Sequence, residues 1–263
     1  MLDESSLLAV ERQRLIREIL QREGVVRNAE LKELLKVSTV TIRSDLRELE
    51  NAGICEVIWG GAVYKRTIPE TNYLTQLTER SKLNPELKRR IGVRAAQLIE
   101  EGQTIIVDAG STTVELIHHL PRNFEYLRIV TPALNVATAA SQFPYVELVM
   151  TGGVLRHLTH SLIGPQVLRS LEMFNADWTF LATEGCDVEY GITASNLLEV
   201  DVKRTMLQRA ERNALMVDSS KFGKVLPLNV VPLQEIQTVI VDTGLGSADI
   251  EALSHLGVEV LAV

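Results

Sequence analysis

The stretch from Val37 to Leu49 reads Val-Ser-Thr-Val-Thr-Ile-Arg-Ser-Asp-Leu-Arg-Glu-Leu and predicts a helix with two different faces. Ile42, Leu46 and Leu49 follow the i, i+4, i+7 spacing of a buried stripe. The other face carries hydroxyls in the first turn and arginines further along, which suits a helix that meets base edges and phosphates. The side chains expected to contact DNA are Ser38, Thr39, Thr41, Arg43, Ser44 and Arg47. Taken alone, the stretch fits an ordinary amphipathic surface helix equally well.

Two further helices are expected before this one. The buried side of the first helix is formed by Leu15, Ile16, Ile19 and Leu20. That helix ends at Gly24, and residues 25–26 suggest a short strand. Asn28 is expected to cap a second helix over residues 29–36. Its inward-facing residues are Leu31, Leu34 and Leu35. Only two residues separate it from the next helix, which predicts a helix-turn-helix.

The end of this region has the pattern of a β-hairpin. Ser38 is a good N-cap for the third helix, and Gly53 is a good C-terminal stop. The β-prone runs 54–59 and 62–64 then flank Gly60 and Gly61, which is a hairpin signal. Three helices and a hairpin predict a winged helix-turn-helix, a small α+β domain.

Residues 11–63 resemble the N-terminal domain of the DeoR family of transcriptional regulators. The matching residues are Glu11, Arg12, Val37, Ser38, Thr41, Ile42, Arg43, Asp45, Leu46, Gly60, Gly61 and Ala62. The resemblance implies that the third helix and the wing, with Gly60 and Gly61, bind double-stranded operator DNA. The chain departs from the family pattern at Ser44, where a second arginine is usual. It also has Glu56 and Trp59 where the wing usually has arginine and histidine.

Composition limits the class of protein. The chain has 263 residues, enough for two domains, and is 46% apolar and 23% charged, as in soluble globular proteins. No apolar run is long enough for a membrane span, and the N-terminus lacks the pattern of a signal peptide. The two cysteines, Cys55 and Cys186, lack metal-site spacing and fit free thiols in a reducing cytoplasm. We therefore expect a cytoplasmic protein that contacts no membrane.

The net charge of −7 is unevenly distributed. Residues 1–66 contain 11 Lys/Arg and 11 Asp/Glu, so residues 67–263 carry the whole excess of acidic groups. Arg43, Arg47, Lys65 and Arg66 could still form a basic face on a neutral domain. The electrostatic attraction to DNA is expected to be weaker than usual.

The rest of the chain predicts an α/β domain. Residues 67–84 are polar and are expected to be a linker, after which Pro85 begins a helix that runs to about Glu101. Beyond it, apolar runs at 105–107, 128–130, 146–150, 179–181, 214–217 and 239–241 alternate with helical segments near 112–120, 133–142, 165–172, 198–211 and 248–256. This alternation favours a mainly parallel sheet. The expected domains are 1–66 and 85–263.

Ligands bind such sheets at the carboxyl ends of the strands. Four loops at these ends carry residues that suit a ligand site. Residues 108–113, Asp-Ala-Gly-Ser-Thr-Thr, offer hydroxyls and backbone N–H groups at a helix start, as an anion site needs. A capped turn without a ligand is the simpler alternative. Neither a Walker motif nor Gly-x-Gly-x-x-Gly is present, which disfavours a nucleotide. The paired glycines 152–153 allow a close backbone approach, residues 184–187 carry two carboxylates, and Lys221 can bind a phosphate.

These four loops also resemble the C-terminal domain of the DeoR family, whose Asp-x-Gly-x-Thr-Thr, Gly-Gly, Gly-x-Asp and Asp-x-Ser-Lys-Phe-Gly motifs occur in this order. The chain departs from the family at Pro132, where asparagine is common. The resemblance implies a sensor domain folded like ribose-5-phosphate isomerase, which binds a phosphorylated sugar or related metabolite. The expected effector-binding residues are Asp108, Gly110, Ser111, Thr112, Thr113, Gly152, Gly153, Glu184, Asp187, Lys203 and Lys221.

Two functions remain open at this stage. The favoured one is an effector-controlled repressor, a homodimer or homotetramer, without a cofactor. The alternative is a sugar-phosphate isomerase in which Glu184, Asp187 and Lys203 supply acid–base chemistry. The Asp-Gly-Ala-Asp-Glu run of the isomerases is missing, and an enzyme does not need a DNA-reading module. No metal site is expected, because the adjacent His118 and His119 would point about 100° apart on a helix, and His157 with His160 has no third ligand nearby in sequence.

Overall fold

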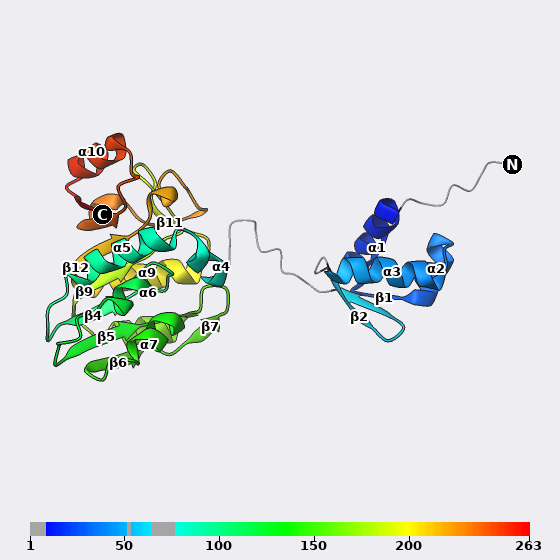
Figure 1. The fold of residues 1–263 in the computed structure, drawn as a ribbon, viewed down its shortest axis with the longest axis horizontal. Coiled ribbons are helices and arrows are strands. Elements are labelled where there is room, and N and C mark those ends of the chain that lie inside the picture. The colour runs from blue at the N-terminus through cyan, green and yellow to red at the C-terminus, as the bar shows by residue number, and fades with distance from the viewer. Residues whose placement is uncertain (1–8, 52–53, 65–76) are drawn as a thin grey trace. The chain divides into compact units, whose positions relative to one another are not determined.

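The computed structural model describes residues 9–51, 54–64 and 77–263. The chain divides into two compact units, Met1–Asn72 and Tyr73–Val263 (Figure 1). Each unit has its own apolar core, one in the first unit and one on each face of the sheet in the second. Across the described ranges, every helix is too short or too polar to cross a lipid bilayer.

The first unit is the winged helix-turn-helix that the sequence predicts. Its elements are α1 (Ala9–Glu23), β1 (Val25–Arg27), α2 (Asn28–Leu35), α3 (Thr39–Asn51), β2 (Cys55–Ile58) and β3 (Gly61–Tyr64). The strands form an antiparallel sheet in the order β1-β3-β2. Gly60, with φ +87°, forms the turn between β2 and β3. The lysine and arginine residues at 65 and 66 lie outside the described residues.

Helix α3 is fixed in this unit by an apolar stripe and a buried ion pair. Ile42, Leu46 and Leu49 are buried, as their spacing predicts. Asp45 on the same side accepts hydrogen bonds from the guanidinium of Arg12 on α1, one of them 3.0 Å long. Because both residues are more than nine-tenths buried, this pair sets the position of α3 on α1.

The caps and exposures of the helices differ in part from expectation. The Thr41 amide donates to Ser38 Oγ at 3.1 Å, so Ser38 caps α3 as predicted. The prediction for Asn28 is wrong, because Asn28 is the first residue of α2 and does not cap it. The predicted burial of Leu34 is also wrong, since its side chain is 64% exposed. An eight-residue helix buries a narrow stripe, which Leu31 and Leu35 fill. Gly53, the expected end of α3, lies outside the described residues.

The second unit is a three-layer α/β domain. Its first elements are α4 (Leu77–Lys82), α5 (Pro85–Ala96), β4 (Thr104–Val107), α6 (Thr113–His118), β5 (Leu127–Thr131), α7 (Leu134–Ala140), β6 (Val146–Met150), β7 (Val154–Arg156), β8 (Ser161–Ile163) and α8 (Pro165–Leu171). They are followed by β9 (Ala176–Leu181), β10 (Gly185–Asp187), β11 (Gly191–Ala194), α9 (Leu197–Gln208), β12 (Ala210–Met216), η1 (Ser219–Lys221), β13 (Leu228–Val231), η2 (Leu233–Glu235), β14 (Thr238–Val241), α10 (Ser247–His255) and β15 (Glu259–Ala262).

Seven strands form one sheet in the order β15-β14-β12-β9-β4-β5-β6, and all of its pairings are parallel. Helices α5, α6 and α7 pack on one face through Ile91, Leu116 and Val136, and Figure 1 shows them on the side turned to the viewer. Helices α8, α9 and α10 contribute apolar residues, among them Val167 and Val200, to the core on the other face. The six predicted strands and five predicted helices of the alternating region are all present.

Four features of this unit were not anticipated. Strands β10, β11 and β13 form a small second sheet, and β7 and β8 form a hairpin beside the main sheet. The stretch 67–84, expected to be a linker, contains helix α4 in its described part. The helix that begins at Pro85 ends at Ala96, earlier than expected. One side chain of helix α4 enters the candidate effector site.

Candidate effector site and DNA-contacting surface

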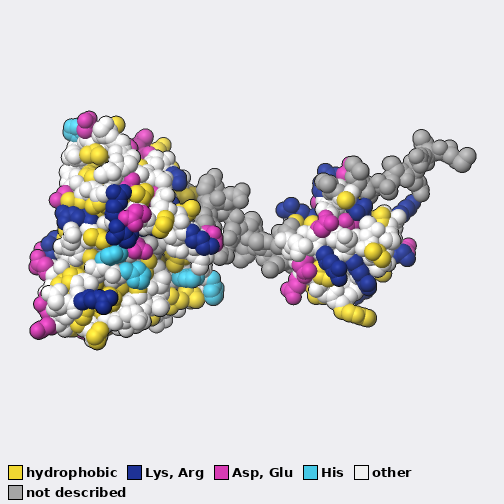
Figure 2. Space-filling view, in the orientation of Figure 1, with side chains coloured by type: hydrophobic (Ala, Val, Ile, Leu, Met, Phe, Trp, Pro, Cys, Tyr) yellow, Lys and Arg dark blue, Asp and Glu magenta, His cyan; other side chains and the backbone are white. Residues whose placement is uncertain are grey.

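The outward face of α3 presents most of the side chains assigned to DNA contact. Arg43, Ser44 and Arg47 are exposed, Ser38 is exposed at the cap, and Thr39 and Thr41 are half-buried. Figure 2 shows lysine and arginine side chains on the face of this unit where α3 lies. These positions fit a recognition helix whose first turn and outward arginines are free to reach a groove.

Three residues of this unit have surroundings that the sequence does not reveal. Val40, in the first turn of α3, is 77% exposed and could contact a thymine methyl group. Trp59 is fully exposed beside Gly60 in the turn of the wing. Gly61 is buried in β3, and a Cβ there would lie 2.0 Å from the Val26 carbonyl oxygen. Its lack of a side chain is therefore explained by strand packing.

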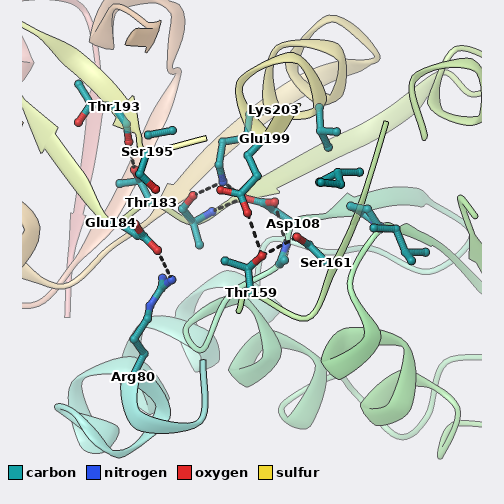
Figure 3. A pocket seen from close by; sticks show the side chains of 17 residues that line it. Arg80, Asp108, Thr159, Ser161, Thr183, Glu184, Thr193, Ser195, Glu199 and Lys203 are labelled. Carbon is teal, nitrogen blue, oxygen red and sulfur yellow. Dashed lines mark hydrogen bonds and ion pairs between the residues drawn. The ribbon is translucent and has the colours of Figure 1, made fainter. Parts of the chain in front are cut away.

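A pocket opens in the second unit at the carboxyl ends of β4 and β9. It contains three of the predicted effector residues, Asp108, Glu184 and Lys203. It also contains residues that sequence reasoning did not select, among them Arg80, Thr159, Ser161, Ser195 and Glu199 (Figure 3).

The carboxylates of this pocket are paired with cations. Lys203 Nζ forms an ion pair with Asp108 and donates to the Ala182 carbonyl at 2.7 Å. Arg80 Nη1 donates to Glu184 Oε1 at 2.6 Å, reaching the pocket from α4 (Figure 3). Glu199 accepts a hydrogen bond from Thr159 at 2.8 Å. The paired charges leave a polar pocket without a large excess of either sign.

Two oxygen atoms of the pocket have no partner among the described residues. They are Glu184 Oε2 and Ser195 Oγ, and both are buried. Buried polar atoms nearly always have a hydrogen-bond partner, so these two oxygens are available to a ligand. A carboxylate acceptor beside a hydroxyl suits a ligand that carries hydroxyl groups.

A second, smaller pocket adjoins the first and is rich in cations. It is lined by Arg80, Lys88, Ser111, Thr112, Thr183, Val217, Asp218 and Lys221. Arg80 and Thr183 line both pockets, which makes the two pockets neighbours. Three cationic side chains face one carboxylate, that of Asp218, and Thr112 makes no capping hydrogen bond with its side chain. This arrangement of cations and hydroxyls suits a phosphate group.

The two lysines of this cationic pocket have lowered pKa values. Burial lowers the pKa of Lys88 to about 8, although the nearby carboxylate of Asp218 opposes this shift. Burial also lowers the pKa of Lys221. A buried ammonium group lacks the solvation of water, and a bound anion would restore part of that stabilisation.

We expect the affinity for a sugar phosphate to decrease as pH rises. An anion binds the protonated form of Lys88, which is lost as pH passes its pKa of about 8. The affinity should fall about tenfold between about pH 7 and about pH 9, in proportion to the charged fraction. Calorimetric titration across this range measures the effect. The Lys88→Met variant should bind the sugar phosphate more weakly at neutral pH, and it should keep only the pH dependence that comes from Lys221. Identical pH profiles for the variant and wild type would contradict the assignment of Lys88 to the phosphate site.

Several predicted effector residues lie outside both pockets. Thr113 is fully buried, and its hydroxyl donates to the Asp108 carbonyl at 2.8 Å. Gly110 packs against Ala182, where a Cβ would meet the alanine Cβ at 2.7 Å. Helix α6 has only six residues, so few aligned peptide dipoles support an anion at its start. The cationic side chains of the pocket supply most of the positive charge instead.

The paired glycines and Asp187 also have structural explanations. Gly152 packs on Gln166, and Gly153 packs on the Ile163 carbonyl and Val167. Asp187 accepts hydrogen bonds from the amides of Glu189 and Tyr190, which closes the turn between β10 and β11. These residues shape the loops around the site without lining it.

The residues missed from sequence came from segments without a motif. Arg80 lies in the stretch expected to be a linker. Lys88 lies on α5 in register with the buried Ile91 and Ala95, and a lysine on a buried helical face was the one available signal. Within the described ranges, no group of three or more His, Cys, Asp or Glu residues is placed to hold a metal ion. The absence of a metal stays a prediction.

Comparisons with known protein families match both units. Residues 12–67 match the DeoR-like helix-turn-helix domain, and residues 83–243 match the DeoR C terminal sensor domain. The chain belongs to the DeoR family of transcriptional regulators. The family resemblance expected from the sequence is thus confirmed over most of the chain.

Relatives match nearly the whole chain. A protein of Escherichia coli O157:H7 with the provisional name of aga operon transcriptional repressor is 36% identical over 96% of this chain and 93% of its own length. The regulator GlpR of Haloferax volcanii is 34% identical over 97% of this chain and 98% of its own. The glycerol-3-phosphate regulon repressor of Escherichia coli K12 is 32% identical over 86% and 87%.

Solved structures add little. Ribose 5 phosphate isomerase A from Neisseria gonorrhoeae aligns with a TM-score of 0.37 and 14% identity over 52% of this chain and 53% of the isomerase. A similarity this low does not establish a shared fold, so the isomerase-like fold of the sensor unit stays a prediction.

Proposed function

We propose that this DeoR-family protein is a repressor of genes for carbohydrate metabolism and that a phosphorylated sugar or related metabolite controls its binding to operator DNA. The observation that carries this proposal is the pair of neighbouring pockets, one cationic and one lined by unpartnered oxygens. Together they suit one ligand with a phosphate at one end and hydroxyls at the other. A relative named as the repressor of a glycerol-3-phosphate regulon supports a phosphorylated effector, and a second relative is named as an operon repressor.

In this proposal the phosphate contacts Ser111, Thr112 and Lys221, together with Arg80 and Lys88. The unpartnered oxygens of Glu184 and Ser195 form hydrogen bonds with the hydroxyl groups of the ligand. The recognition helix α3 reads the operator, with Arg43 as the chief base-contacting residue. The protein acts in the cytoplasm.

The direct test is calorimetry with the purified full-length protein and a panel of phosphorylated compounds. The panel contains inorganic phosphate, glycerol 3-phosphate, and pentose, hexose and amino-sugar phosphates, each beside its unphosphorylated form. Binding of one phosphorylated compound, with little binding of its unphosphorylated form, supports the proposal. A panel without any binding member removes it. Gel-shift assays with and without that compound then give the sign of its effect on DNA binding.

Catalysis of isomerisation is the weaker alternative. An isomerase needs a general base that is free to take a proton. Here Glu184 is paired with Arg80, and Lys203 is paired with Asp108. The carboxylate of Asp187 accepts two amide hydrogen bonds in a turn. These contacts support a binding role. Conversion of any bound sugar phosphate at an enzyme-like rate would require a bifunctional protein instead.

We also propose that the protein acts as a homodimer or homotetramer. One DNA-binding module covers roughly 600–1,000 Å², which is little for a specific regulator. Two modules on half-sites about one helical turn apart would double that area. Light scattering should therefore give a mass of two or four chains at micromolar concentration. A single-chain mass with and without operator DNA would contradict this expectation.

A further inference from the structure

We propose that helix α4 couples the effector site to the DNA-binding unit, because an anion in the cationic pocket fixes α4 on the sensor unit. This inference rests on the proposed function, in that it needs a phosphate-bearing ligand in that pocket. Helix α4 is the first described element after residues 65–76, which join the two units. A change in how α4 is held therefore occurs at the point where the chain leaves the sensor unit.

Helix α4 contacts the rest of the sensor unit near its two ends and makes few contacts between them. At its start, Leu77 is buried, and its amide donates to the Leu158 carbonyl at 3.1 Å, in the loop between β7 and β8. Toward its end, Arg80 forms the 2.6 Å ion pair with Glu184. The rest of the helix is exposed, namely Thr78, Glu79, Ser81 and Lys82.

Lys88 forms hydrogen bonds at the C-terminal end of the helix. Its buried ammonium group donates to the carbonyl oxygens of Arg80 and Leu83, at the C-terminal end of α4. Two of the groups that hold α4, Arg80 and Lys88, are therefore also cations of the smaller pocket. Figure 3 shows Arg80 reaching from its helix toward Glu184 at the pocket wall.

An anion can use these two cations without breaking the bonds they already make. A guanidinium has five N–H donors and an ammonium has three, so both keep donors for a phosphate after bonding to the protein. A phosphate bound by Arg80 and Lys88 on one side and by Ser111, Thr112 and Lys221 on the other would cross-link α4 to the loops that follow β4 and β12. The ligand thus adds bonds that exist only when α4 is docked.

The physical consequence is a two-state element. A six-residue helix does not hold together in water by its own hydrogen bonds, so α4 depends on its docking contacts. A ligand that binds only the docked state shifts the equilibrium toward the docked state. By linkage, any change that loosens α4 weakens the binding of the ligand. This relation makes the proposal testable at a residue that does not touch the ligand.

Leu77→Ala is that test. Leu77 lines neither pocket, and its truncation removes the apolar anchor of α4. The full-length variant should bind the phosphorylated compound identified by calorimetry at least about tenfold more weakly, because less of the protein has α4 docked. The matched control is Leu83→Ala, which makes the same change at a side chain that is 51% exposed at the other end of α4. It should bind like wild type.

Hydrogen exchange in the full-length protein provides the second readout. At about 100 times the dissociation constant of that compound, exchange of the amides of α4 through local opening should slow by up to about 100-fold. Inorganic phosphate at saturation should give part of this protection.

The outcomes separate the two proposals. If wild type binds none of the phosphorylated compounds, the proposed function fails. If wild type binds one of them but the exchange of α4 is unchanged, the coupling role of α4 is overturned while the effector site stands. The coupling role is also overturned if Leu77→Ala binds the compound like wild type and keeps the full effect of the compound on DNA binding.

Discussion

Replacing Arg43 with alanine is expected to weaken specific operator binding by about 1–3 kcal/mol, roughly 5- to 150-fold. The side chain is exposed on α3, outside the buried stripe. An arginine there can donate two hydrogen bonds to the major-groove edge of a guanine, and alanine makes neither. Fluorescence anisotropy with DNA from upstream of the protein's own gene measures the loss, and the same assay with unrelated DNA measures the loss of specificity.

Arg17→Ala is the matched control for this variant. Arg17 is an exposed arginine on α1, so its loss removes the same charge without touching the recognition helix. Both variants should keep the thermal stability of wild type, since substitutions of exposed side chains usually change it little. Equal affinities of Arg43→Ala and wild type for operator DNA would remove Arg43 from base recognition.

Replacing Thr112 with glutamate is expected to abolish the response to the effector while DNA binding survives. Thr112 faces the cationic pocket beside Lys88 and Lys221. A carboxylate there would occupy the place of the phosphate and pair with the cations that should bind it, so two negative charges would compete for one site. Calorimetry should detect no binding of the phosphorylated compound, and gel-shift assays should show that it no longer changes the occupancy of the operator.

Two further variants isolate the charge effect. Thr112→Val keeps the shape and removes one hydroxyl, so we expect weaker binding with a retained response. Thr138→Glu places the same charge on an exposed position of α7 and should behave like wild type. If Thr112→Glu binds the phosphorylated compound as tightly as wild type, the loop at residues 108–113 is not the phosphate site.

The fold of both units could be predicted from sequence because periodicity reports it directly. Ile42, Leu46 and Leu49 repeat at helical spacing, and the buried strands of the main sheet are short apolar runs. Periodicity gave no sign of the β7–β8 hairpin or of the small β10-β11-β13 sheet, whose strands have three or four residues each. Leu34 was misjudged because how much of a helix is buried depends on its neighbours, and the sequence does not reveal them.

The candidate site was predictable only where a loop carries a motif. Ser111, Thr112 and Lys221 are brought together from separate strands, as the parallel topology predicts. Arg80 and Lys88 were missed because each is an isolated cation that only the tertiary fold brings to the pocket. Asp187 was selected for its carboxylate, yet a hairpin turn uses that group, and sequence alone does not separate a carboxylate that binds a ligand from one that closes a turn.

The chain has two tryptophans, and each unit contains one. Trp59 is fully exposed at the turn of the wing, whereas Trp178 is 5% exposed, stacks on Phe180 with 5.5 Å between ring centroids, and lies under Arg212. The protein therefore carries two natural fluorophores in opposite environments, one exposed to solvent and one buried. In a Trp178→Phe variant the tryptophan emission would come from the wing alone, so the approach of DNA to the wing could be followed optically, without any attached dye.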